Sequence, residues 1–397
     1  MEYKFSDKLE ALKPSAIREI FKSLADPSII SFAAGNPSPL SFPVKELAKI
    51  SADIFENEST TALQYSITEG YIPLREDVVA RLKNKFGIDA EVDNTVIISG
   101  GQQGIELSCK ALCNEGDNVI CEDPSFIGGL NAFRSCGANT VGLPLESDGP
   151  DPDALEKLLC ETPNVKLIYL IPTFQNPTGI TTSLEKRKAL YKIAAAHGVM
   201  IFEDNPYGEL RFAGEEIPTM KSMDTEGIVI YASTFSKILS SGMRVGYVTA
   251  PKPIIQKMVV AKQVEDVHTN IFFQMMCHRY IHEYDLDAHI RDIRALYRAK
   301  CNLMLSALDE HMPKEITYTR PDGGLFLWGT LPDSVNEKAF VKRALEKKVA
   351  VVPGETFNCD PALPSQSFRL NYSTPSDEDI VRGVVLLAET AREMLAE

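Results

Sequence analysis

Two short apolar runs enclose a polar loop in the stretch Ile228-Val-Ile-Tyr-Ala-Ser-Thr-Phe-Ser-Lys-Ile-Leu-Ser-Ser-Gly-Met-Arg-Val-Gly-Tyr-Val248. The runs 228–231 and 245–248 do not alternate cleanly between apolar and polar residues, which is typical of strands buried on both faces. Lys237 lies in the loop between them. Ligands of α/β proteins bind at the carboxyl ends of such strands, so this loop is a candidate binding site.

Similar runs lie on the amino-terminal side of this stretch, and helical patterns separate several of them. The expected strands are 95–99, 118–121, 167–171 and 199–202, and the expected helices include 102–113 and 183–197. Strands that alternate with helices predict an α/β domain with a mostly parallel sheet.

The regular alternation of strands and helices ends at about residue 290, and a smaller α+β domain is expected after it. Its predicted helices are 291–308, 337–347 and 378–395, and its predicted strands are 316–319, 324–328 and 367–371. The first 45 residues read as an arm with one helical stretch at 15–24. We therefore divide the chain into residues 1–48 (the arm and part of the small domain), 49–289 (the large domain) and 290–397 (the small carboxyl-terminal domain).

Composition and charge exclude several classes of protein. The chain has 397 residues and a formal net charge of −14, and nucleic-acid binding normally requires a basic surface. No apolar run reaches the roughly 18 residues of a membrane helix. Residues 1–13 are polar and charged, unlike a signal peptide. We expect a cytoplasmic protein whose eight cysteines are reduced.

The cysteines do not predict a metal site. No Cys-x-x-Cys pair occurs, and Cys109 and Cys113 lie four apart in an expected helix without an accompanying ligand set. Buried small apolar side chains are the better interpretation, and we expect no metal cofactor.

Polar motifs follow three of the other predicted strands. They are Ser99-Gly-Gly-Gln-Gln-Gly104, Asn176-Pro-Thr-Gly179 and Glu203-Asp-Asn-Pro-Tyr207. The first can place backbone N–H groups and a helix N-terminus against an anion, or it can be a plain turn. Two acidic residues at the end of an apolar strand are costly unless they are paired or needed. In the loop after the expected strand 228–231, Thr234, Ser236 and Arg244 can supply hydroxyls and a guanidinium for a phosphate.

Together these motifs resemble fold-type I aminotransferases that depend on pyridoxal 5′-phosphate (PLP). The segment 233–247 is similar to their cofactor-lysine segment, and 176–179 and 204–207 are similar to two further motifs in the same order. The separations of 28 residues (204 − 176) and 33 residues (237 − 204) also suit the family. Further matches, which extend the resemblance over essentially the whole chain, are Pro37-Ser-Pro39, Leu63-Gln-Tyr-Ser66 and Ser367-Phe-Arg-Leu370. The most similar branch contains 2-aminoadipate aminotransferase and kynurenine aminotransferase II.

The resemblance implies a large domain with a mostly parallel seven-stranded sheet, and it implies roles at the cofactor. Lys237 would carry PLP as a Schiff base and then act as the general acid and base. Asp204 would pair with the pyridine nitrogen, and Asn176 and Tyr207 would bond the phenolic oxygen. Phe126 would stack on the ring. The phosphate would be held by Gly101, Gln102, Thr234, Ser236 and Arg244.

The resemblance also implies substrate contacts and a partner chain. Arg369 would grip the substrate α-carboxylate, with Asn176 and Gly35 also at the substrate. Tyr65 would reach the cofactor site of a second subunit, which implies a homodimer. Arg18, in the arm, would pair with a distal carboxylate or swing out for other side chains, although a solvated arginine on an amphipathic helix explains it equally well.

Three functions are compatible with these residues. The first is ping-pong transfer of the amino group of an L-amino acid (2-aminoadipate, aromatic or aliphatic) to a 2-oxo acid, with 2-oxoglutarate as the expected acceptor. The second is a PLP-dependent β-lyase, which would use the same lysine, aspartate and arginine. The third is the sensor domain of a transcription regulator, which the negative charge disfavours, as does the lack of a stretch before residue 50 that could form a DNA-binding domain.

Overall fold

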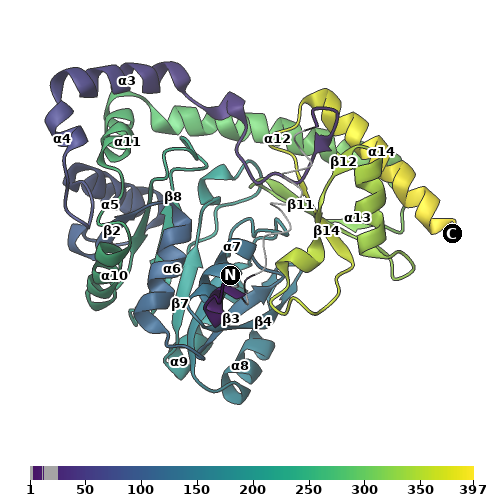
Figure 1. Ribbon diagram of the computed structural model, residues 1–397, viewed down its shortest axis with the longest axis horizontal. Coiled ribbons are helices and arrows are strands. Elements are labelled where there is room, and N and C mark those ends of the chain that lie inside the picture. The colour runs from purple at the N-terminus through teal and green to yellow at the C-terminus, as the bar shows by residue number, and fades with distance from the viewer. Residues whose placement is uncertain (1–2, 11, 13–25) are drawn as a thin grey trace.

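The computed structural model describes residues 3–10, 12 and 26–397. Figure 1 shows a large sheet flanked by helices on one side of the molecule and a smaller sheet with its own helices on the other. The helices are α1 (Asp7–Glu10), α3 (Val44–Asn57), α4 (Ser59–Leu63), α5 (Ile72–Phe86), α6 (Gly101–Leu112), α7 (Ile127–Ser135), α8 (Pro152–Glu161), α9 (Leu184–His197), α10 (Lys252–Glu265), α11 (Ile271–Glu283), α12 (Leu286–His311), α13 (Glu337–Glu346) and α14 (Asp377–Leu395).

The large sheet contains β2 (Thr95–Ile98), β3 (Asn118–Asp123), β4 (Asn139–Glu146), β5 (Gly149–Pro150), β6 (Val165–Leu170), β7 (Met200–Asp204), β8 (Val229–Thr234) and β9 (Gly246–Thr249). Their order across the sheet is β2-β9-β8-β7-β6-β3-β4-β5. Strands β8, β7, β6, β3 and β4 are parallel neighbours, whereas β9 and β5 run antiparallel to the strands beside them. The prediction of a mostly parallel sheet is confirmed. The predicted number of seven strands is exceeded by one, because the chain turns back after β4 and adds the two-residue β5 at the edge.

Helices cover both faces of this sheet because its strand residues are apolar on both sides. Side chains of α6, α7 and α10 pack on one face, where Val119, Phe202 and Ile230 form part of a buried cluster. Side chains of α8 and α9 pack on the opposite face against Ile168 and Ile201, among others. Adjacent residues such as Ile201 and Phe202 therefore point to opposite sides, as the twofold period of a strand requires.

The smaller sheet is antiparallel and lies against α13 and α14 (Figure 1). Its strands, in spatial order, are β10 (Thr317–Tyr318), β11 (Phe326–Thr330), β14 (Ser367–Asn371) and β13 (Val352–Pro353). A separate parallel pair joins β1 (Ile30–Ser31) to β12 (Val349–Ala350), so this part of the predicted arm is hydrogen-bonded to the carboxyl-terminal part of the chain. Helix α12 runs without a break from 286 to 311, across the predicted boundary at 289, and the boundaries stay predictions.

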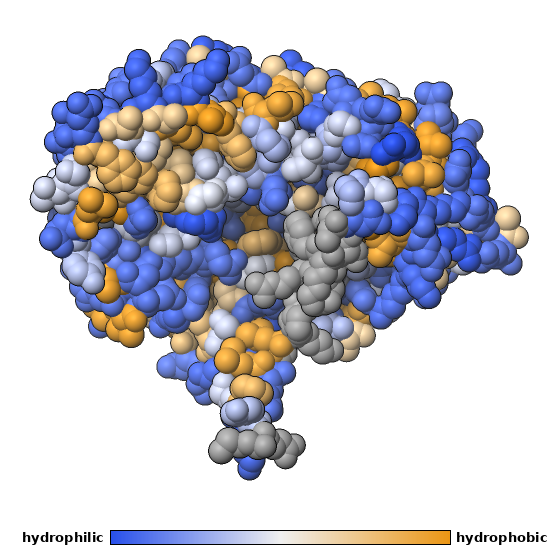
Figure 2. All heavy atoms as spheres, turned by 45° about the horizontal axis from the view of Figure 1, so that its top comes forward, coloured by the Kyte–Doolittle hydropathy of each residue, from blue (hydrophilic) through white to orange (hydrophobic). Residues whose placement is uncertain are grey.

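An apolar groove lies on the described surface beside α4. It has a volume of about 660 Å³ and is lined by Phe55, Leu63, Tyr65, Phe272 and Phe273, among others. Figure 2 shows apolar side chains gathered on the side of the molecule where Figure 1 draws α3, α4 and α11. Among the described residues, no helix is long and apolar enough to cross a membrane.

Candidate active site

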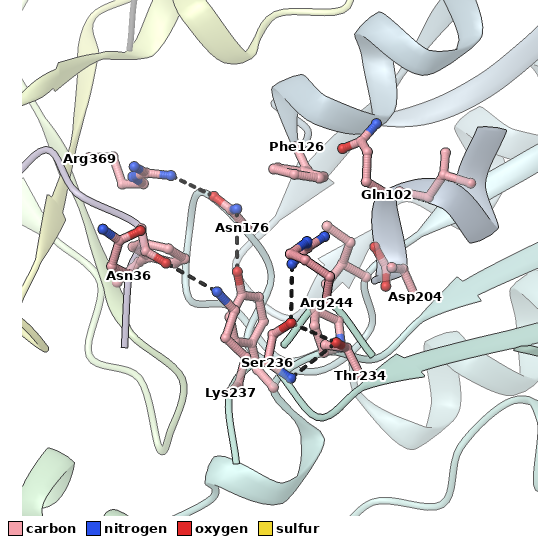
Figure 3. Close-up of a pocket in the computed structure, with 17 residues that line it drawn as sticks. Asn36, Gln102, Phe126, Asn176, Asp204, Thr234, Ser236, Lys237, Arg244 and Arg369 are labelled. Atoms are coloured by element: carbon pink, nitrogen blue, oxygen red, sulfur yellow. Dashed lines mark hydrogen bonds between the residues drawn. The ribbon is translucent and has the colours of Figure 1, made fainter. Parts of the chain in front are cut away.

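A cavity of about 300 Å³ lies at the carboxyl ends of β6, β7 and β8 and at the N-terminus of α6 (Figure 3). Most of the residues predicted from the sequence line it. These are Gly35, Gly101, Gln102, Phe126, Asn176, Asp204, Tyr207, Thr234, Ser236, Lys237, Arg244 and Arg369. The edge of the parallel strands therefore collects side chains that are far apart in the sequence, as the topology predicts.

Lys237 follows β8 and points into the cavity (Figure 3). Its Nζ donates a hydrogen bond of 3.1 Å to the carbonyl oxygen of Gly35 and lies 5.8 Å from the centre of the Tyr207 ring. Burial is the main cause that lowers the pKa of Lys237 to about 8, and the positive charges of Arg244 and Arg369 act in the same direction. The amine can therefore lose its proton near neutral pH, which an ordinary lysine cannot.

Asp204 ends β7 and has only 4% of its surface exposed. The hydroxyl of Tyr169, on the neighbouring β6, donates a hydrogen bond of 2.8 Å to its Oδ2. Burial raises the pKa of Asp204 to about 7, although the Tyr169 hydrogen bond and the charge of Lys237 oppose the shift. No ion pair to Asp204 occurs among the described residues, so its carboxylate can accept a cation in the cavity.

The adjacent acid Glu203 has a different role, which the sequence could not show. Its carboxylate points away from the cavity and accepts hydrogen bonds of 2.9 and 2.7 Å from the backbone N–H groups of Met220 and Lys221. Because successive strand side chains face opposite sides, only one of the two acids can reach the site. The choice of Asp204 as the site residue agrees with this geometry.

An anion-binding cradle forms where α6 begins. Gly101 and Gln102 are the first residues of the helix, whose unpaired N–H groups and dipole favour negative charge. The guanidinium of Arg244 bonds the Ser236 hydroxyl at 3.3 Å and the carbonyl oxygen of Ser99 at 3.3 Å. Gly100 has φ 82°, and a Cβ there would come within 2.0 Å of Arg244, so only glycine allows this approach.

A buried polar network lies next to the turn between β2 and α6. Sequence analysis did not predict this network. Lys262 is fully buried on α10, and its ammonium bonds Asp266 at 2.8 and 2.9 Å and the Gln103 side chain at 2.8 Å. The Ser99 hydroxyl donates to Asp266 at 2.7 Å, and the Ser99 N–H donates to Gln103 at 2.8 Å. These bonds fix the turn between β2 and α6, which presents the cradle.

Arg369, on β14, approaches the cavity from the smaller sheet. Its Nη1 donates to Asn176 at 3.0 Å and its Nη2 to the carbonyl oxygen of Ala33 at 2.9 Å. The side chain is 2% exposed, and its Nε has no hydrogen-bond partner. No carboxylate of the described residues pairs with it, and burial lowers its pKa to about 10. A buried guanidinium without an anion is costly, which indicates that the site receives one.

The remaining predicted residues complete the walls of the cavity. The Asn176 side chain donates a hydrogen bond of 3.4 Å to the Tyr207 hydroxyl. Figure 3 places Phe126 across the cavity from Ser236 and Lys237. Sequence reasoning missed several lining residues, namely Asn36, Ile105, Ile171, Pro206 and Phe326. Pro206 lies within the quoted motif 203–207 but was given no role. The other four are common residue types outside the quoted motifs, so only their position in space marks them.

The structure does not place two of the predicted residues, Tyr65 and Arg18, at the cavity, for different reasons: Tyr65 lies elsewhere, and Arg18 is not described. Tyr65 is 82% exposed and packs edge-on against His268, with 5.9 Å between the ring centres. It therefore does not contact the site of its own chain, and its role across a subunit boundary stays a prediction. Arg18 and the predicted helix at 15–24 lie outside the described residues, so the role of Arg18 also stays a prediction.

The cavity fits the chemical groups of PLP. Asp204 offers a buried carboxylate for a ring N–H⁺, and the cradle of α6 and Arg244 offers donors for a phosphate. Lys237, with its lowered pKa, offers an amine that can react with an aldehyde. The mostly parallel sheet and this site together define a PLP-dependent enzyme of fold type I.

Comparison with known proteins identifies the family. The family model described as aminotransferase class I and II matches residues 27–385. Aromatic-amino-acid aminotransferase 1 of Thermococcus litoralis is 38% identical over 393 residues, which cover 98% of this chain and 94% of the relative. The chain belongs to the class I and II aminotransferases, and it is a PLP-dependent aminotransferase.

Two solved structures share the whole fold. The kynurenine aminotransferase of Pyrococcus horikoshii, in complex with PMP and kynurenine, has a TM-score of 0.94 at 39% identity, with 98% of this chain and 97% of that chain covered. LysN of Thermus thermophilus, an alpha-aminoadipate aminotransferase complexed with N-(5'-phosphopyridoxyl)-L-leucine, has a TM-score of 0.91 at 38% identity, with 99% and 98% covered.

Proposed function

We propose that the protein transfers the amino group of an L-amino acid with a long aliphatic, aromatic or acidic side chain to 2-oxoglutarate. The observation that carries the proposal is Arg369, a buried cation that lacks a carboxylate partner among the described residues. Amino acids and 2-oxo acids share an α-carboxylate, which a guanidinium binds through two parallel hydrogen bonds. Both half-reactions would use the same arginine, so the two substrates would occupy one site in turn, as the proposed ping-pong mechanism requires.

The apolar residues of the cavity wall support a broad range of amino-acid donors. Ile171 and Phe326 line the cavity and suit aliphatic and aromatic side chains. Among the described lining residues the cations are Lys237, Arg244 and Arg369, and each has a role at the cofactor or the α-carboxylate. The relatives named for aromatic amino acids, kynurenine and alpha-aminoadipate match the same range.

The residues around the cofactor divide the chemistry between them. When bound, PLP would act as an electron sink for the electrons left on the substrate Cα. Lys237 would move a proton between the substrate Cα and the C4′ atom of the cofactor. Its lowered pKa suits it to this role. Asp204 would keep the ring nitrogen protonated, and Tyr169 would hold the Asp204 carboxylate in position. Asn176 and Tyr207 would bond the phenolic oxygen.

A donor panel tests the proposal. The purified enzyme should form glutamate from 2-oxoglutarate with 2-aminoadipate, leucine, methionine, kynurenine or an aromatic amino acid as donor. Release of pyruvate and ammonia from cysteine-type substrates, without glutamate formation, would instead support a β-lyase.

The variant Arg369→Lys provides the control within this panel. A lysine keeps the positive charge but cannot make the bidentate bond, so KM should rise by about tenfold or more for every donor and for 2-oxoglutarate alike. An effect on one substrate only would show that Arg369 contacts a side chain instead of the shared carboxylate.

We also propose that the protein is a cytoplasmic homodimer. The groove beside α4 leaves Leu63 and Tyr65 exposed by 73% and 82%, and apolar surface of this kind marks interfaces between proteins. All eight cysteines are free thiols, as a reducing compartment requires.

The dimer has a direct test. Light scattering should give twice the chain mass of 43.9 kDa for the native protein. The variant Leu63→Asp should give the mass of a single chain, because the substitution would bury a charge in the interface. Leu363 is 51% exposed in another part of the chain, so Leu363→Asp should stay dimeric. A monomeric native protein, or equal masses for both variants, would contradict the proposal.

A further inference from the structure

Two histidines and an aspartate from two adjacent helices converge on one point, away from the cavity described above. His278 and His282 lie one turn apart on α11, and Asp77 lies on α5, which packs against it (Figure 1). The Nδ1 atom of His278 is 2.6 Å from one Asp77 carboxylate oxygen, and Nε2 of His282 is 2.7 Å from the other. The three ligand atoms all lie within 4.8 Å of one another.

We propose that Asp77, His278 and His282 form a Zn²⁺ site with water as the fourth ligand. Two imidazole nitrogens and one carboxylate oxygen are ligands that zinc prefers, at about 2.0–2.2 Å from the metal. Histidines at i and i+4 share one face of a helix, so both can reach a single ion. Binding requires neutral histidines, and the ion takes the place of any proton that a histidine shares with Asp77.

The surroundings of the three side chains favour binding of an ion. Asp77 and His278 are largely covered, with side chains 11% and 22% exposed, whereas His282 is 57% exposed and leaves an entry path from solvent. The Tyr71 ring packs edge-on against His278, at 5.7 Å between ring centres, and restricts its orientation. The neighbouring cation Arg279 is bound to Asp53, Glu58 and Glu283 and therefore does not compete for Asp77.

A bound ion would connect α5 to α11. The same two helices are also joined near their first residues, where the Gln274 side chain accepts a hydrogen bond of 2.8 Å from the Tyr71 N–H. Zinc would therefore stabilise the packing of this helix pair and would play no part in amino transfer. Asp77 is 201 positions from His278 in the chain, so the sequence pattern by itself shows only a His-x₃-His pair.

Zinc titration of the holoenzyme tests the proposal. Protein that has been treated with EDTA and desalted should bind one Zn²⁺ per chain at this site, measured by competition with a chromophoric chelator. His282→Gln and Asp77→Asn should each weaken that binding by more than about tenfold. Zn²⁺ should raise the unfolding temperature of the unmodified protein but not of these variants. Co²⁺ should give a visible ligand-field spectrum that the variants lose.

A second cluster supplies a matched control. Glu156, Cys160 and His197 also lie close together, but two of the three are exposed. His197→Gln should therefore leave the affinity and the Co²⁺ spectrum of the proposed site unchanged. Circular dichroism would confirm that His282→Gln, a change at a largely exposed side chain, is folded. Unchanged zinc binding in both His282→Gln and Asp77→Asn, or no zinc binding by the native protein, would overturn the proposal.

Discussion

Replacement of Lys237 by alanine is expected to abolish amino transfer and the covalent attachment of the cofactor. The Lys237 amine lies in the cavity, and its pKa of about 8 lets it exchange a proton near neutral pH. The native protein should be yellow and should retain PLP after borohydride reduction and denaturation, as shown by mass spectrometry. Lys237→Ala should retain none, and its rate should fall by many powers of ten, at about 1.4 kcal/mol of barrier for each.

The variant Lys237→Arg separates charge from proton transfer. A guanidinium keeps the cation in the cavity but does not lose its proton, so this variant should be as inactive as Lys237→Ala. In the native enzyme the rate should rise as pH increases through about 8, because the free amine is the base that removes the substrate proton. A Lys237 variant that transaminates at the native rate would refute the assignment.

Replacement of Asp204 should lower the rate by several powers of ten and weaken cofactor binding. The carboxylate would supply the charge partner of the ring nitrogen through a charge-assisted hydrogen bond, of about 1.5–3 kcal/mol. Asp204→Asn preserves the size of the side chain and removes the charge, and Asp204→Ala removes both. Both variants should show this loss in kcat, measured with saturating PLP.

Glu203 is the control for Asp204. It is equally buried on the same strand, but its carboxylate bonds the backbone of Met220 and Lys221 on the other side of the sheet. Glu203→Gln should therefore lower the unfolding temperature and leave kcat of the folded enzyme nearly unchanged. A loss of less than about tenfold for Asp204→Asn, about 1.4 kcal/mol, would show that Asp204 is not the partner of the ring nitrogen.

The strands that end in functional residues were predicted correctly because their signals are local. A run of apolar residues followed by a polar motif marked β2, β6, β7 and β8. The structure places β6, β7 and β8 side by side, and β9 separates β8 from β2. Strand β4, at 139–146, was missed. Its side chains are mostly half-buried or exposed near the edge of the sheet, and Pro144 interrupts it, so no apolar run marks it.

Helix ends followed from the same kind of local signal. Ser183 was predicted to begin a helix, and it caps α9, where its hydroxyl accepts a hydrogen bond from the Lys186 N–H. The long helix predicted from 291 begins earlier, at Leu286, where Asp285 caps it. The apolar spacing already begins in this first turn, where Leu286 and Ile290 are buried, so the predicted start at 291 was too late.

The sequence by itself determined the class of the protein, the strands that lead to the site and the motifs that carry Lys237, Asp204 and Asn176. These features depend on residues that are neighbours in the chain. Only the tertiary structure decided that Asp204 faces the cavity while Glu203 faces away. It also showed that Tyr169 donates a hydrogen bond to Asp204, and that Arg369 donates one to Asn176, which is 193 residues away in the chain. Such contacts arise because packing brings distant segments together, and a buried charge keeps its place only where that packing supplies a partner or leaves room for one.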